Sequence, residues 1–451
     1  MGTRGSLLTG VRVSIIGAGS ATFSMNLVRD LCLKESLRGS TVCFMDVDEE
    51  RLNIIHGLAR RFAEEVGADI RFEKTLTRKE ALLDSDFVIN TAMVGGHNIE
   101  EEERRIEESC GYYRGLRLGM YLHQLKLMLS VARDIEDACP DTWLIQASNP
   151  VFDGCTLMTR QTKAKIVGLC HGHYGAYEVA RVIGIDSEEV TFQAPGLNHC
   201  IWMTHFHHRG EDAYPLIDKW VKEKAEEYWR TWDGRPMDVQ MSPAAVSLYN
   251  MFGLFPIGDT PRFAGAWWHH VDLESKKRWY NKYGGFDSEL GWSYYLNGLS
   301  RQVDNMSQLY RDSSAQVSKE FPPTMSREEH IPIIDALVND NEGKYQVNVP
   351  NKGALLGFGD DVVVEVPGIV SGRGVEAVQV DGLPKHLTNH ILRTHIVQME
   401  MGLEAFLTGD RRILLNRILS DPRTKSYEQA VNVMDAVMNI PFNEDLKELF
   451  R

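Results

Sequence analysis

The sequence has few of the features that mark secreted, membrane or nucleic-acid-binding proteins. It has 49 Lys and Arg against 63 Asp and Glu, a formal net charge of −14, and it contains no basic stripe of the kind that nucleic-acid binding needs. Its seven cysteines, an odd number in 451 residues, do not indicate a disulfide framework. No run of about 20 apolar residues predicts a membrane span, and residues 1–10 lack the apolar stretch of a signal peptide. We therefore expect a cytoplasmic protein without nucleic-acid or membrane partners.

The residues that are present predict an α/β fold. Hydrophobic residues make up 43% of the chain and charged residues 25%, which is ordinary for a globular protein with a large core. In the first half, short apolar stretches alternate with segments of helical spacing. The expected strands span 11–16, 41–45, 87–90, 142–147, 165–169 and 190–194, and the expected helices span 21–33, 49–66 and a segment through 122–135. Because parallel neighbours need crossover connections, this order predicts a Rossmann-like, doubly wound parallel sheet.

The character of the sequence changes after about residue 200. Segments become longer and richer in Trp, Tyr and His, and three helices are expected to close the chain over 387–407, 411–419 and 427–438. We find no internal repeat and no low-complexity linker. The sequence therefore predicts a Rossmann-like domain over residues 9–196 and a second, α+β domain over residues 197–451.

A glycine-rich turn joins the first expected strand to the first expected helix. Gly17 and Gly19 let the backbone turn tightly, and the helix that follows offers free N–H groups to a pyrophosphate. The usual third glycine is absent, since Thr22 stands in its place. Asp46 ends the next strand and favours NAD over NADP because a carboxylate accepts hydrogen bonds from the ribose 2′-OH, although it is also suited to capping the next helix. The predicted cofactor contacts are Gly17, Gly19, Ser20, Asp46 and Asn90.

Residues capable of metal or acid–base chemistry follow three of the expected strands. Cys170, His171 and His173 come directly after strand 165–169, and His199 comes shortly after strand 190–194. The carboxyl ends of strands face the ligand crevice in a doubly wound sheet, and a thiolate with an imidazole makes a suitable metal pair. By pattern alone, buried core residues are an equal interpretation. Asn149, after strand 142–147, is expected to hold a ribose or substrate hydroxyl, or else to form a turn with Pro150.

Together these segments resemble glycoside hydrolase family 4, the NAD-dependent glycosidases that do not use the usual pair of carboxylates. The segments that carry the resemblance are Gly17-Ala18-Gly19-Ser20, Met45-Asp46, Ala147-Ser148-Asn149-Pro150, Cys170-His171-Gly172, Leu197-Asn198-His199, Gly258–Arg262, Asn348–Gly353 and Val364–Pro367. Cys170-His171-Gly172 is similar to the α-glucuronidase subgroup, as are the stretches 199–215 and 421–427. An α-galacturonidase is the close competitor, because the two sugars differ in the orientation of one hydroxyl.

The resemblance implies an NAD⁺- and Mn²⁺-dependent hydrolysis of α-glucuronides. Oxidation at C3 acidifies the C2 hydrogen, a metal stabilises the enediolate as a Lewis acid, the group at C1 leaves, water adds there, and C3 is reduced again. The resemblance implies Cys170 and His199 as the metal ligands and Asp259 as the base at C2, although Gly258–Pro261 is also a good turn signal. A thiolate ordinarily favours Zn²⁺ or another soft ion, so another divalent metal stays open.

The proton donor and the substrate contacts are less well defined by the sequence. Many family members have a Gly-Asp-Thr-x-Gly stretch after the segment that matches 110–113, and this chain lacks it, so His171, His173 or a metal-bound water are the candidate acids. A uronate carboxylate needs nearby cations in so acidic a protein. For this contact we expect Arg262 first, then Arg114 and His173, whereas ordinary ion pairs are the alternative for both arginines.

Other functions of the same fold also fit the first half of the chain. An α-glucosidase of the same family, a lactate/malate-type NAD-dependent dehydrogenase and a non-catalytic dinucleotide sensor are the alternatives. The dehydrogenase is disfavoured because its familiar Arg/His pairing is not apparent and the second half is too long. The expected partners are a small sugar substrate and further copies of the chain, in a homodimer or homotetramer with the second domain contributing to substrate binding and oligomerisation.

Overall fold

One large mixed β-sheet runs through the protein. The structure is a computed structural model that describes residues 10–451, without the side chains of residues 21 and 22. Within this range the sheet has the order β12-β9-β8-β14-β13-β6-β5-β4-β1-β2-β3, with β15 beside β14. Its strands are β1 (Arg12–Ile16), β2 (Thr41–Met45), β3 (Arg71–Thr75), β4 (Phe87–Asn90), β5 (Trp143–Gln146), β6 (Lys165–Gly168), β8 (Gly196–Leu197), β9 (Cys200–Met203), β12 (Phe255–Ile257), β13 (Gly343–Pro350), β14 (Val363–Ser371) and β15 (Gly374–Ala377).

The N-terminal half of the sheet is parallel and doubly wound, as the sequence predicts. Strands β3, β2, β1, β4, β5 and β6 lie side by side in that order and all run the same way. Strands β1, β2 and β4 are apolar and almost completely buried, which is typical of parallel strands covered by helices on both faces. The chain order reverses beside β1, and this is the point at which doubly wound sheets bind ligands.

The second half of the chain extends the same sheet with antiparallel strands. The β13–β14 hairpin pairs from Gly343 with Val370 to Pro350 with Val363, and it joins β6 where Asn348 meets Gly168. Strand β8 then pairs with β14, and β9 and β12 follow. Strands on both sides of residue 196 therefore share one sheet, and the division into two domains there stays a prediction. The predicted Rossmann-like domain begins at residue 9, which lies outside the described residues.

One predicted strand lies elsewhere. Residues 190–194 were expected to complete the parallel series, but β7 (Val190–Gln193) pairs antiparallel with β10 (His205–His208) in a separate sheet that also contains β11 (Glu211–Asp212). The prediction was wrong because β7 is largely unburied, whereas a strand inside a parallel sheet is covered on both faces.

The helices of the N-terminal half connect the parallel strands. They are α1 (Ala21–Leu33), α2 (Glu49–Val66), α3 (Arg78–Leu82), α4 (Gly96–Ser109), α5 (Leu118–Ala138), α6 (Val151–Gln161) and α7 (Gly175–Ile183). Local signals fix the ends of α2, because the Asp48 side chain accepts a hydrogen bond from the Arg51 N–H at 3.0 Å and Gly67 ends the helix in the left-handed region, with φ 68°. The bounds of α1 and α2 agree with the sequence prediction.

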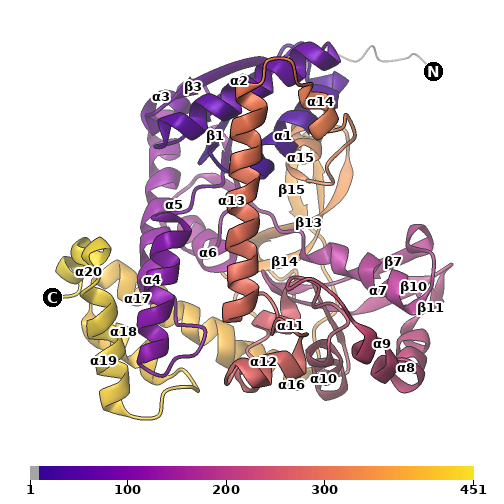
Figure 1. Cartoon of the computed structure of the whole chain (residues 1–451), viewed down its shortest axis with the longest axis vertical. Helices are drawn as coiled ribbons and strands as arrows, with labels where there is room; N and C mark the ends of the chain where they lie inside the picture. The colour runs from indigo at the N-terminus through magenta and orange to yellow at the C-terminus, as the bar shows by residue number, and fades with distance from the viewer. Residues whose placement is uncertain (1–9) are drawn as a thin grey trace.

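Between the strands of the second half lie α8 (Tyr214–Glu223), α9 (Ala225–Thr231), α10 (Pro243–Phe252), α11 (Thr260–Phe263), α12 (Leu273–Trp279), α13 (Glu289–Arg311), α14 (Val317–Glu320) and α15 (His330–Asn339). Helix α13 is long and runs along the molecule to pack on α1 and α2 (Figure 1). Helix α13 was not predicted from the sequence, because its buried residues are few (Gly291, Trp292 and Met306) and most of its surface is polar.

The C-terminal helices return to the N-terminal half. They are α16 (Lys385–Ile391), a π-helical segment (Leu392–Ile396), α17 (Val397–Thr408), α18 (Arg411–Leu419), α19 (Tyr427–Met438) and α20 (Glu444–Leu449), so the three predicted helices are present. Helix α19 packs against α4 and α5, beside which the C-terminal helices lie in Figure 1. Among residues 10–451, no helix combines the length and apolar character that a membrane span requires.

We expect the turn after β1 to tolerate no side chain at Gly17. Its φ is +84°, and an added Cβ would lie 2.5 Å from the Cα of Ala92, so Gly17→Ala forces the backbone to move. Gly184, with φ +86° and nothing within 4 Å of an added Cβ, is the matched control. Gly184→Ala should lose about 1 kcal/mol of unfolding free energy, the cost of a left-handed L-residue, and Gly17→Ala clearly more. Chemical denaturation measures both, and equal losses would contradict the close approach.

Candidate active site

The glycine turn lies against the end of the neighbouring strand. The N–H groups of Gly17 and Ala18 donate to the Met45 carbonyl at 2.9 and 3.0 Å, so the turn is fixed to β2. No side chain caps the N-terminus of α1, and its first turn contains no acidic residue. The backbone N–H groups of the first turn of α1 are therefore suited to an anion, and the strand–turn–helix arrangement is the one that the sequence predicts.

Two of the predicted cofactor residues already bind the protein itself. The Asp46 carboxylate accepts hydrogen bonds from the N–H groups of Gly19 at 2.7 Å and Asp48 at 2.9 Å. A carboxylate has further acceptor positions, so Asp46 stays a candidate for a ribose contact. Asn90 is completely buried, donates to the Gln146 side chain at 3.0 Å and accepts from the Ala92 N–H at 3.3 Å. Its side chain thus has a structural role, and its predicted cofactor contact stays a prediction.

The chemically capable residues gather at the carboxyl edge of the sheet from different elements. Asn149 is exposed between β5 and α6, and Cys170 follows β6 as expected. His199 reaches the same edge by another route, because Asn198 and His199 form the turn between the antiparallel strands β8 and β9. The prediction that His199 follows a strand of the parallel sheet was therefore wrong, although His199 does lie at the expected edge. His199 has φ 62°, a conformation that a tight hairpin turn requires.

Asp259 faces His199 across this edge. Its Oδ2 lies 3.5 Å from Nε2 of His199, and its Oδ1 accepts a hydrogen bond from Nη2 of Arg262 at 2.5 Å. Burial raises the pKa of Asp259, but the charge and the hydrogen bond of Arg262 outweigh it, so the pKa is lowered overall. Asp259 is therefore ionised at neutral pH. Burial lowers the pKa of His199, and the nearby Asp259 opposes this effect only in part, which leaves the imidazole neutral.

Arg262 links Asp259 to a second carboxylate that the sequence analysis did not identify. Its Nη1 donates to Oδ1 of Asp287 at 3.0 Å, and its guanidinium lies 4.7 Å from the ring centroid of Phe286. Lys276 is completely buried, with Nζ 3.8 Å from Asp287. Burial lowers the pKa of Lys276 to about 7, against the opposing charge of Asp287. Both arms of Arg262 are therefore already bound to carboxylates.

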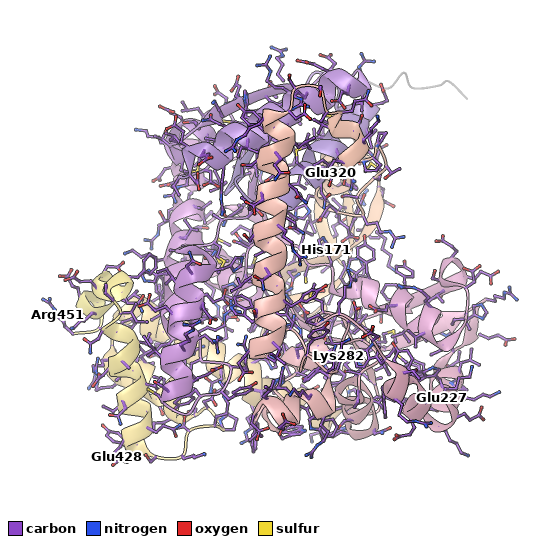
Figure 2. The ribbon with its side chains drawn as sticks, in the orientation of Figure 1. His171, Glu227, Lys282, Glu320, Glu428 and Arg451 are labelled. Atoms are coloured by element: carbon purple, nitrogen blue, oxygen red, sulfur yellow. The ribbon has the colours of Figure 1, made fainter. Side chains whose placement is uncertain are left out.

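The two remaining histidines contact a pair of glutamates. Nε2 of His171 lies 2.6 Å from Oε2 of Glu328, and Nε2 of His173 lies 3.4 Å from Oε1 of Glu329. Burial lowers the pKa of His171, but the hydrogen bond and charge of Glu328 outweigh it, and the net shift is upward. His171 is about half exposed and lies near the centre of the view in Figure 2. His173 is buried, and its Nδ1 has no hydrogen-bond partner within residues 10–451.

The buried carboxylate of Glu365 acts electrostatically on the Cys170 thiol. Glu365 is completely buried on β14, and its Oε2 accepts a hydrogen bond from the Asn198 side chain at 3.1 Å. Burial raises the pKa of the Cys170 thiol, and the negative charges of Glu365 and Asp259 raise it further. The sequence analysis used Glu365 as part of a motif without giving it a role. The one sequence signal for a role is that Glu365 is a single acidic residue within a largely apolar strand.

The donor set at this edge suits a divalent cation that the substrate helps to bind. In the described part of the chain, no group of three or more His, Cys, Asp and Glu is arranged to hold a metal ion. A cation held here by the Cys170 thiol and the His199 imidazole would take its further ligands from substrate or water oxygens. A dication there would offset the negative charges that oppose ionisation of Cys170. This is the open coordination that a catalytic site needs, in contrast to a structural one.

The fold and the candidate site together define a protein with a dinucleotide-type fold whose sheet edge carries a thiol, imidazoles and carboxylates. A family model described as "Family 4 glycosyl hydrolase" matches residues 12–185, and one described as "Family 4 glycosyl hydrolase C-terminal domain" matches residues 194–424. The chain therefore belongs to glycosyl hydrolase family 4, which confirms the resemblance seen in the sequence and makes this a glycosidase-family protein in place of a lactate/malate-type dehydrogenase.

Relatives of several specificities align over most of the chain. An α-galactosidase of Bacillus subtilis (strain 168) is 24% identical, covering 92% of this chain and 94% of the relative. An α-galacturonidase of Thermoanaerobacter italicus is also 24% identical, covering 96% and 97%. The crystal structure of a 6-phospho-α-glucosidase from gut microorganisms, in complex with NAD and Mn²⁺, has a TM-score of 0.79 at 19% identity and covers 97% of this chain and 99% of that one. That structure shows the same fold.

Asp287 should be more important for stability than an exposed acid. Asp287→Asn removes the carboxylate between Arg262 and Lys276, and breaking a buried ion pair costs about 3–5 kcal/mol because it leaves a buried charge unpaired. The matched control is Asp233→Asn, where the partner Lys282 is exposed, and surface changes of this kind stay within about 0.5 kcal/mol. Chemical denaturation at pH 7 compares the two. Equal losses would contradict the importance of this ion cluster.

Proposed function

We propose that the protein hydrolyses α-glucuronides with NAD⁺ and Mn²⁺, or another divalent metal, as cofactors. The observation that carries this proposal is the convergence of Cys170, His199 and Asp259 at the carboxyl edge of the sheet that also carries the Gly17–Gly19 turn. Most glycosidases hydrolyse their substrate directly with a pair of carboxylates. This site instead combines a thiol, an imidazole and a carboxylate beside a dinucleotide turn, which suits an elimination that is assisted by a redox step.

The chain's own residues fit both cofactors. For NAD⁺, the contacts are Gly17, Gly19 and Ser20 at the pyrophosphate and Asp46 at the ribose, with Asn149 near the sugar. The uncapped start of α1 and the lack of room for a Cβ at Gly17 support this assignment. For the metal, Cys170 and His199 are the protein ligands. A bound NAD⁺ would accept the hydride that leaves C3 of the sugar. A bound divalent cation would act as a Lewis acid on the sugar oxygens at C2 and C3.

Asp259 then serves as the base that removes the C2 proton. Its lowered pKa keeps it ionised at neutral pH, and the Arg262 hydrogen bond fixes one of its oxygens and leaves the other toward His199. His171 is the proposed proton donor to the leaving group. Its contact with Glu328 favours the protonated imidazole, and its half-exposed ring is accessible to a sugar.

A uronide is favoured among family substrates because buried cations gather beside Asp259. Arg262 and Arg114 act electrostatically on Asp287, as does Lys276 when it is protonated, so basic side chains are concentrated here in a protein of net charge −14. This local excess of positive charge suits an acidic substrate. An α-galacturonide is the second candidate, supported by relatives that carry that name. The predicted contacts of Arg262, Arg114 and His173 with the substrate all belong to this proposal.

Cellular setting and assembly form a separate part of the proposal. All seven cysteines are free, which agrees with a reducing, cytoplasmic compartment. We further propose a homodimer or homotetramer, with residues 197–451 contributing to substrate binding and assembly.

A substrate and cofactor panel tests the proposed activity. Aryl α-glucuronide, α-galacturonide, α-glucoside and phosphorylated glucosides are each assayed with and without NAD⁺, Mn²⁺ and a thiol reductant. We expect turnover of an α-uronide only when all three additions are present, because the hydride acceptor, the Lewis acid and the reduced Cys170 thiol are each required. Cys170→Ser should abolish it, whereas Cys32→Ser, at a cysteine outside this edge of the sheet, should not. Uronide turnover in the presence of a chelator, or turnover of neutral or phosphorylated sugars alone, would contradict the proposal.

A further inference from the structure

Arg114 has a charged side chain with two nitrogens that lack a hydrogen-bond partner in the described part of the chain. Its side chain is 11% exposed, and its Nε and Nη1 are buried without a hydrogen-bond partner among residues 10–451. Oε1 of Glu108 lies 4.0 Å from Nη1, and Oε2 of the same glutamate already pairs with Arg104 at 2.6 Å. Burying an unpaired charge is costly, so this arrangement indicates an anion that arrives from outside the chain.

The hydrogen-bond partners of Arg262 and Arg114 differ, and this difference shows which arginine has donors left for a substrate. Both arginines interact electrostatically with Asp287, but the two Nη atoms of Arg262 donate hydrogen bonds to Asp287 and Asp259. Arg114 reaches Asp287 only through its charge, and its guanidinium lies 6.0 Å from the ring centroid of Trp292. Two of the N–H donors of Arg262 already bind carboxylates, whereas Nε and Nη1 of Arg114 bind none within residues 10–451. Arg114 is therefore better placed to bind a carboxylate from outside the chain.

The backbone that presents Arg114 is held in an unusual shape. Residues 110–117 join α4 to α5, and Gly111, Arg114, Gly115 and Arg117 all have positive φ. The buried Glu107 carboxylate accepts hydrogen bonds from the N–H groups of residues 116–118, which anchors the end of the loop. A non-glycine residue held at φ 61° persists when its surroundings enforce it, and this pattern occurs at ligand-binding sites.

Arg423, from the segment between α18 and α19, enforces this shape on both sides of Arg114. Its Nη1 donates to the carbonyls of Tyr113 at 3.3 Å and Gly115 at 2.9 Å. Its Nε and Nη2 bind the Asp421 carboxylate at 2.9 and 2.8 Å, which fixes its orientation. Helix α19 also contacts the start of the loop, since Nε2 of Gln429 donates to the Cys110 carbonyl at 3.0 Å.

We propose that Arg114 binds the carboxylate of the acidic sugar, and that Arg423 is a positioning residue that aims Arg114 at it. This inference rests on the proposed function and replaces Arg262 as the first candidate for the contact. Arg262 then acts within the protein, where it orients Asp259. The specificity for an acidic sugar thus depends on a contact between the C-terminal helices and the α4–α5 loop.

The test compares kcat and KM for an aryl α-uronide and the matching neutral α-glucoside. Hydrogen bonds to charged groups contribute about 1.5–3 kcal/mol, so Arg114→Gln should raise the uronide KM roughly 10- to 100-fold and reduce the preference for uronide over glucoside by a similar factor. Arg114→Lys should recover part of the preference, because the charge remains and the fork is lost. Arg423→Gln should raise the uronide KM by a smaller factor.

Non-additivity separates positioning from a general structural effect. If Arg423 acts through Arg114, the double variant should have the same uronide preference as Arg114→Gln alone. Arg412→Gln is the control, since that arginine is 91% exposed and pairs with Asp410 on the same C-terminal part of the chain, and it should match the parent. If Arg423→Gln does not fold, Arg423→Lys keeps the charge beside Asp421 and should show the same loss of preference in a milder form.

Two results would overturn the inference. One is an Arg114→Gln variant that keeps the parent's uronide KM, and the other is an Arg423 variant that raises KM equally for uronide and glucoside. Failure of the proposed function looks different, because the parent enzyme would then not hydrolyse the uronide at all. Titration calorimetry with free glucuronate, galacturonate and glucose provides a second readout. The parent should bind the acids more tightly than glucose, and Arg114→Gln should remove that difference.

Discussion

The buried chain of charges Asp259–Arg262–Asp287 is the interaction on which the site depends. Arg262 binds both aspartates, and Lys276 approaches the second one from the other side. Because Arg262 fixes one oxygen of Asp259, the other oxygen stays directed at His199, and because the arginine lowers the pKa of Asp259, the carboxylate is ionised at neutral pH. The same pairing occupies one N–H of each Nη atom of Arg262, which is why we propose Arg114 for the contact with an acidic substrate.

The mixed sheet brings these charges to the glycine turn. The parallel strands carry the turn and Cys170 to one edge, as doubly wound sheets do. The antiparallel strands β13, β14, β8, β9 and β12 then continue the same sheet, so that the turn between β8 and β9 brings His199 to the edge and the chain after β12 brings Asp259. Glu365 on β14 contacts Asn198 beneath this edge. The site therefore lies where the parallel and antiparallel halves meet.

The sequence predicted the features that depend on local chemistry. The β1–turn–α1 unit, the bounds of α2 and the place of Cys170 after β6 follow from apolar runs, caps and glycines close together in the chain. It did not predict contacts between distant segments. Asp287, Lys276 and Glu328 are separated from their partners by loops whose pairing no short pattern encodes, and β7 and α13 have too few buried residues to signal their place. For the same reason the sequence ranked Arg262 above Arg114, since only the fold shows which of them is already bound.

The central claim is that Asp259 removes a proton from C2 of the sugar before the glycosidic bond breaks. Hydrolysis of an aryl α-uronide in D₂O, followed by NMR of the released sugar, tests it directly. The account predicts one deuterium at C2 in every product molecule, because the proton taken by the carboxylate exchanges with solvent before it returns. Product that keeps its original hydrogen at C2 would contradict the elimination and would require bond cleavage by direct displacement at C1.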